Sequence, residues 1–191
     1  MRIASYLLVL SVISILLIGC GGSQETQNVS PNCKVPTWYN TVPQDPNYLF
    51  APNTATSRDL QLAVDKAIQA GRTEIGRQQE VKINGLQKRF QEETGFGADA
   101  QLLDMFTQVG KTVVSTVLSG SHAKYQEQCQ EGEIWRAWVL VEYPTGAAAQ
   151  AFRDQIKNNE QMFTRFRATE TYKELEEEVK KYEDFKKEQG K

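Results

Sequence analysis

The spacing of apolar and polar residues divides the chain into a leading apolar run, a short polar stretch and a long mixed region. Residues 3–18 are apolar apart from three serines, and residues 21–35 are polar and lack aromatic side chains. From residue 36 onward, apolar residues recur at helical or strand spacing. Helical and strand patterns within one region predict an α+β fold, a compact domain whose antiparallel sheet packs around a helix and is followed by a long C-terminal helix.

Helical spacing predicts two helices in the first half of the mixed region. Thr56 with Asp59 three residues later is typical of a helix start, and the face that follows is apolar through Ile75. After a polar, helical stretch from Leu86 to Thr94, residues 95–97 break the chain. Asp99 is then expected to cap a second helix that runs through Leu118.

Alternating patterns predict four strands. Tyr48–Ala51 reads as a short strand that Pro52 ends or holds at an edge, and residues 80–84 alternate as in a half-buried strand. The segments 123–129 and 134–143 predict a hairpin around residues 130–133. Its second arm is apolar on both faces, which indicates a central strand.

The C-terminal region predicts a helix that begins after Pro144 and breaks near Ala168. Beyond the break, Tyr172, Leu175, Val179 and Tyr182 recur at three-four spacing. This stripe fits a coiled-coil seam, and it equally fits a single helix that lies on its own domain. Three heptad positions are too few to distinguish the two. An earlier apolar stripe of the same region already has the domain to cover it, and consists of Phe152, Ile156, Phe163 and Phe166. We therefore expect the terminal stripe to be at least partly an intermolecular contact.

Composition excludes several classes of protein but does not identify a function. The chain has 191 residues, is 40% hydrophobic and 24% charged, and carries a net charge of -2, so it is neither disordered nor built to bind nucleic acid. One histidine and three cysteines leave little material for a catalytic triad or a transition-metal centre. Gly110-Lys111-Thr112 lies inside an amphipathic helix rather than in a phosphate-binding loop. We therefore expect no enzyme, no catalytic residues, no metal and no cofactor.

The first twenty residues carry the strongest signal. Arg2, the apolar run and the ending Leu17-Ile18-Gly19-Cys20 are typical of a secretory signal peptide, and they resemble a bacterial lipobox. The resemblance implies that residues 1–19 are removed and that Cys20 carries lipid, so that Cys20 holds the protein on a membrane. A transmembrane anchor, or a signal without lipidation, is the alternative. Residues 20–35 would form a flexible tether between the lipid and the domain.

Two further cysteines remain in the exported chain. Cys33 and Cys129 can pair, because compartments outside the cytoplasm are oxidising. They can equally stay as two thiols, since sequence does not give their geometry.

Several segments resemble the LPP-twenty family of bacterial lipoproteins. The resemblance rests on Pro36-Thr37-Trp38, Tyr48–Ala51, Ala55-Thr56-Ser57 and the motifs listed here: Glu80–Ile83, Lys88–Glu93, Thr107–Ser119 and Arg136–Val141. It covers roughly residues 36–144 and implies a lipid-anchored protein of the cell envelope. Related proteins include lipoproteins of the flagellar basal body. Pro52-Asn53 departs from the family, which usually has a glycine there, although Asn53 tolerates positive φ.

These observations predict four regions, 1–19, 20–35, 36–144 and 145–191, in a lipoprotein anchored through Cys20, with the outer membrane as its expected location. Its expected role is structural or in protein interaction, including self-association or contact with other envelope proteins. A module that binds a small ligand or a cell-wall fragment is the alternative. Candidate interaction residues are Trp38, Tyr172, Leu175, Val179 and Tyr182.

Overall fold

The computed structural model describes residues 33–190, and Cys20 therefore lies outside the described residues. These residues form a three-stranded antiparallel sheet, six α-helices and the short 3-10 helix η1, which confirms the α+β class. The elements follow the order α2 (Thr37–Asn40), β1 (Tyr48–Ser57), α3 (Leu60–Thr94), η1 (Phe96–Ala98), α4 (Ala100–Gly120), β2 (His122–Glu131), β3 (Ile134–Pro144), α5 (Thr145–Lys157), α6 (Glu160–Phe166) and α7 (Glu170–Gln189).

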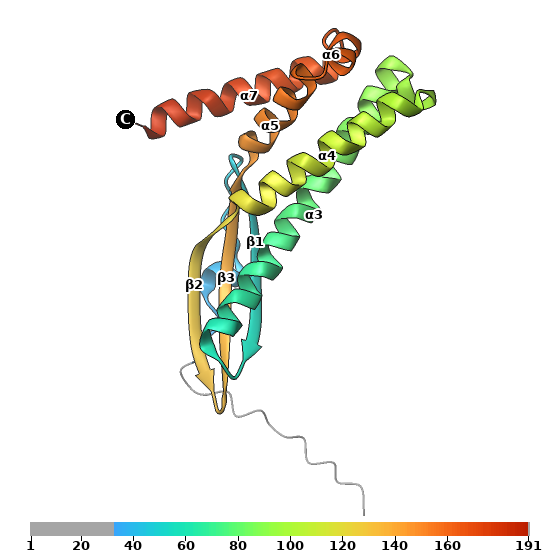
Figure 1. Cartoon of the computed structure of the whole chain (residues 1–191). Coiled ribbons are helices and arrows are strands. Elements are labelled where there is room, and N and C mark those ends of the chain that lie inside the picture. Colours follow the sequence, from blue (N-terminus) through green and yellow to red (C-terminus); the bar gives the residue numbers. More distant parts are fainter. Residues whose placement is uncertain (1–32, 191) are drawn as a thin grey trace, which may run out of the picture.

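The sheet has the strand order β1-β3-β2, so β3 is central as its two apolar faces predict. The predicted hairpin is also confirmed, and Gly132 adopts a φ of 62° in its turn. Tyr48 pairs with Pro144 while Ser57 pairs with Trp135, so β1 runs from the helical end of the sheet to the hairpin end. The molecule is elongated between these two ends (Figure 1).

α3 is the longest element, with 35 residues and hence a length of about 52 Å. Its first half lies on the sheet and its second half pairs with α4 (Figure 1). The strand predicted over residues 80–84 is wrong, because this segment lies inside α3. Ile83 is buried and belongs to a helical face with Leu86 and Phe90, whereas Val81 is 62% exposed on the opposite side.

The close contact between α3 and the sheet depends on small side chains. Ala63 and Ala67 are fully buried. A Cβ at Gly71 would overlap the side chain of Val141 on β3. These residues bring the helix axis near the strands.

β1 is longer than predicted, because it continues through Pro52 and Asn53. Proline is tolerated in this strand since β1 is an edge of the sheet. Among the described residues only glycines have positive φ, so Asn53 makes no left-handed turn. The helix consequently starts later than Thr56, with Asp59 as its N-cap and the Leu62 amide as the donor at 2.7 Å.

The helical end of the molecule, opposite the hairpin, contains a cluster of aromatic rings. Centroids of neighbouring rings lie 4.5–6.2 Å apart. The five buried rings come from α3, η1, α4, α5 and α6, namely Phe90, Phe96, Phe106, Phe152 and Phe166. The predicted regions 36–144 and 145–191 therefore share one hydrophobic core.

The C-terminal region consists of three helices rather than two. The break predicted near Ala168 is confirmed, since α6 ends at Phe166 and α7 begins at Glu170. A further break separates α5 from α6, where the side chain of Asn159 accepts a hydrogen bond from the Met162 amide at 2.9 Å. α7 then lies along α5 (Figure 1).

Candidate functional site

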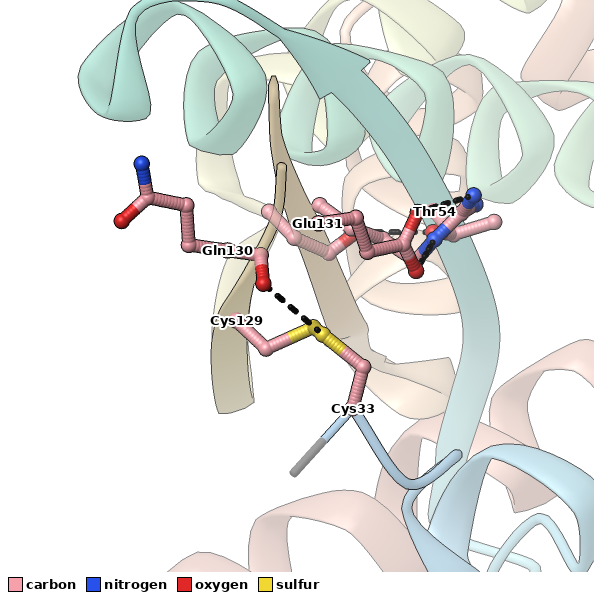
Figure 2. Close-up of a disulfide and its surroundings, with 7 residues drawn as sticks. Cys33, Thr54, Cys129, Gln130 and Glu131 are labelled. Carbon is pink, nitrogen blue, oxygen red and sulfur yellow. Dashed lines mark hydrogen bonds and ion pairs between the residues drawn. A yellow bond between two sulfur atoms is a disulfide. The ribbon is translucent and has the colours of Figure 1, made fainter. Parts of the chain in front are cut away.

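The start of the described chain is joined covalently to the sheet. Cys33 and Cys129 form a disulfide across 96 residues, with their Cα atoms 5.5 Å apart, so the pairing that the sequence left open is present (Figure 2). Cys129 lies in β2 close to the hairpin turn. The chain therefore enters the fold at the hairpin end of the sheet.

The disulfide lies beside an acidic side chain without forming a metal site. Glu131 is close to both sulfur atoms, but disulfide sulfurs have no thiolate to offer a metal. The Glu131 carboxylate instead accepts two hydrogen bonds from the Arg136 guanidinium, at 2.7 and 3.0 Å (Figure 2). This bonding lowers the pKa of Glu131 and raises that of Arg136. The disulfide and the Glu131–Arg136 ion pair therefore stabilise the hairpin end of the sheet.

Residues 33–47, named here the strap, connect the disulfide to the start of β1. Pro36 is buried, and the Trp38 Nε1 donates a 2.7 Å hydrogen bond to Glu127 on β2. The Trp38 ring also lies 5.8 Å from the ring of Tyr125. Strand alternation puts Tyr125 and Glu127 on the sheet face opposite α3. Trp38 is therefore half-buried and already engaged by its own chain.

The outer face of the sheet also holds a buried carboxylate with two basic neighbours. Glu142 on β3 is 8% exposed. Its two oxygens lie 2.7 Å from the Lys124 Nζ and 3.3 Å from the His122 Nε2. The hydrogen bond from Lys124 raises the pKa of that lysine, because it stabilises the ammonium form. A register shift between Ala123 and Tyr125 marks a bulge at Lys124.

Aromatic rings surround the Lys124 ammonium. Its Nζ lies 5.4, 5.3 and 5.9 Å from the ring centroids of Tyr48, Phe50 and Tyr125. Phe185 at the end of α7 packs on Tyr48 at 6.0 Å. No local pattern in the sequence indicates this cluster, because its members come from two strands, β1 and β2, and from the distant helix α7. Its cation-binding positions are filled by the protein's own lysine.

The terminal stripe of the C-terminal region is buried within the chain. Tyr172, Leu175 and Val179 are each at most 2% exposed, and burial raises the pKa of Tyr172 to about 12. Tyr182 is half-buried where α7 crosses Gly146 of α5. The expectation that these side chains contact another subunit is therefore wrong for the three buried ones. A Cβ at Gly146 would overlap Tyr182, so α7 lies closely on α5 at this point.

A carboxylate on α3 fixes the start of α7. Glu93 accepts hydrogen bonds from the amides of Glu170 and Thr171 at 2.7 and 3.0 Å, and from the Thr171 hydroxyl. The hydroxyl contact is the largest cause that lowers the pKa of Glu93. A carboxylate at a helix N-terminus satisfies free amides and complements the helix dipole. Glu93 is thus a docking residue rather than part of a solvated polar stretch.

A groove runs along the contact between α3 and α4 at the helical end. Its volume is about 340 Å³, and its lining includes the apolar side chains of Ile83, Val114 and Leu118. Lys111 and Gly110, part of the triplet discussed above, line the α4 side of this groove. They lie in mid-helix, where the backbone amides are bonded within the helix, so no phosphate-binding loop exists there.

Within residues 33–190, none of the helices combines the length and the apolar character that crossing a membrane requires. No family model, curated protein or solved structure matches the chain.

Proposed function

We propose that the chain is a lipoprotein of the cell envelope, held on a membrane by lipid on Cys20, with a structural or protein-interaction role. The observation that carries the proposal is the disulfide between Cys33 and Cys129. Structural disulfides persist in oxidising compartments and are rare in the cytoplasm. The bond therefore agrees with the export signal that residues 1–20 carry.

The position of the disulfide supports an anchoring role as well. Thirteen residues after Cys20, the bond joins the chain to β2, so a pull on the tether would reach the sheet directly. The helical end, with the second half of α3, α4 and α7, lies away from this attachment point (Figure 1). We propose that the hairpin end faces the membrane and that the helical end meets protein partners. The resemblance described above extends the proposal to outer-membrane assemblies such as the flagellar basal body.

Fractionation of cells that express the whole chain tests the anchor. Cys20→Ala should move the protein from the membrane pellet to the soluble fraction, because each buried lipid CH₂ contributes about 0.8 kcal/mol to membrane binding. Ser23→Ala, which leaves the lipobox intact, is the matched control and should stay in the pellet. A Cys20→Ala protein that still pellets after a high-salt wash would contradict the lipid anchor.

A binding module for a cell-wall fragment is the second candidate. Tyr125 is 42% exposed on the outer face of the sheet, next to the half-buried Trp38, and exposed aromatic rings favour stacking on sugars. Soluble cell-wall fragments should then raise the melting temperature of the protein by mass action, and Tyr125→Ala should remove the shift. An unchanged melting temperature at millimolar fragment rejects this second candidate.

A further inference from the structure

α4 faces the solvent with an unusual kind of surface. Its outward positions repeat at three-four spacing over Gln101, Asp104, Gln108, Lys111 and Ser115, all of which are exposed. This spacing is the seam of two helices that cross at a small angle. The charged residues among the 21 of α4 are Asp104 and Lys111 alone.

Four hydroxyl groups on the exposed surface of α4 are already satisfied within the helix. Thr107, Thr112, Thr116 and Ser119 each donate a hydrogen bond to the carbonyl four residues earlier, at 2.9–3.0 Å. A partner helix that covers these four side chains leaves none of their hydroxyl protons without an acceptor. Their short side chains also lose little rotamer freedom on burial. Burial of this surface therefore costs little free energy.

The groove beside α4 supplies apolar area for the same contact. It lies between α3 and α4, with Ile83, Val114 and Leu118 among its lining residues. Glu80 and Asn84 of α3 form part of its polar rim. A ridge of side chains from a second helix fits such a groove, as in ordinary helix packing.

The two charged residues of α4 indicate which helix packs against it. Asp104 and Lys111 are one heptad apart, and within residues 33–190 neither forms an ion pair or a side-chain hydrogen bond. In an antiparallel pair of α4 helices with its two-fold axis between Thr107 and Gln108, Asp104 of each copy faces Lys111 of the other. One symmetric contact thus pairs both charges twice.

We propose that α4 is a self-association surface, on which a second copy of this chain packs its α4 antiparallel, with two reciprocal Asp104–Lys111 ion pairs. The inference names the partner left open by the proposed function, and it rests on that function only for the membrane, where tethering raises the effective concentration of the copies. The contact itself requires no lipid.

Charge reversal tests the pairing in the whole chain purified in detergent. Asp104→Lys and Lys111→Asp each place like charges opposite one another twice in a homodimer. Each should weaken dimerisation by roughly tenfold or more, measured by sedimentation velocity across a concentration series. A one-to-one mixture of the two variants should regain the wild-type dimer fraction, because the mixed pair restores both ion pairs.

Glu177→Lys on the exposed side of α7 is the matched control and should dimerise like the wild type. Circular dichroism melting verifies that every variant is folded. Three results would each overturn the proposal: a wild-type chain that stays monomeric throughout the series, single variants that dimerise like the wild type, or folded variants whose mixture stays monomeric. The outcome is independent of Cys20→Ala fractionation, so failure of the dimer and failure of the anchor are distinguishable.

Discussion

The two ends of the molecule are held together by different means. At the hairpin end, β2 has no buried residue, and the strap is fixed to it by a disulfide. At the helical end, five phenylalanine rings and the stripe of α7 are buried, and the described residues form no covalent link there. A thin, polar part of a sheet buries little apolar area, so a covalent bond compensates there for what packing provides at the other end.

The helical end itself contains two contrasting surfaces. α7 is rich in charge, yet its apolar stripe is consumed by contacts within the chain. α4 has two charged residues, and beside its outward side lies a groove that residues 33–190 leave open. An amphipathic pattern therefore identifies a buried face without showing which molecule buries it. The exposed surface at this end belongs to α4, the helix whose sequence looked less like an interface than that of α7.

Removing the disulfide should have the largest effect on stability. Replacing Cys33 and Cys129 together with serine should lower the free energy of unfolding by about 2–5 kcal/mol, because the bond joins residues 96 positions apart and so closes a long loop. Urea unfolding of the oxidised and reduced wild type gives the matched comparison. Equal midpoints for the two forms would show that the hairpin end does not depend on the bond.

Truncating the α7 stripe should have the next largest effect. Leu175→Ala should cost about 2–4 kcal/mol of unfolding free energy, because Leu175 is 2% exposed and the truncation leaves a cavity against α5. Glu177→Ala, on the exposed side of the same helix, should change stability by less than about 0.5 kcal/mol. If Leu175→Ala melted like the wild type but changed subunit number, the stripe would be an intermolecular surface after all.

Loss of the Glu93 cap should have a smaller, pH-dependent effect. Glu93→Ala should cost about 1 kcal/mol at neutral pH, the range of an exposed helix cap. The pKa of Glu93 is lowered in the folded protein, so its contribution is present above the ordinary pKa of a glutamate and is lost as the pH falls through the folded-state pKa. Thermal melts between pH 7 and pH 3 should therefore show the variant and the wild type converging in acid. A constant difference would mean that the Glu93 charge does not act at α7.

Local patterns in the sequence predicted the elements whose periodicity is strong. The hairpin, the central position of β3 and the Asp99 cap of α4 are confirmed, since each depends on neighbours in sequence. The strand predicted from Val81 and Ile83 is wrong. Two apolar residues two positions apart resemble a strand pattern, but here they lie in a helix and only Ile83 is buried.

Contacts between distant segments could not be predicted in the same way. Glu93 and Thr171 are 78 residues apart, and nothing near either residue shows that they meet. The pairing of Cys33 with Cys129 likewise required geometry. A usable signal existed for α7, because Gly146 on α5 has no side chain and so lets Tyr182 of another helix lie closely against it.

Two glycines on α3 should give effects of opposite sign at the two ends of the molecule, and Gly85→Ala should give the smallest effect of all. Gly71 lies against the sheet, where a Cβ would overlap Val141, so Gly71→Ala should lower stability by about 1–3 kcal/mol despite the better helix propensity of alanine. Gly85 lies further along α3, and a Cβ there would have nothing within 4 Å. Gly85→Ala should therefore raise stability by about 0.5–1 kcal/mol, through a less flexible unfolded chain and higher helix propensity. Urea midpoints of the two variants check both signs, and a stabilising Gly71→Ala would mean that the sheet end tolerates a wider helix-to-strand spacing than this fold contains.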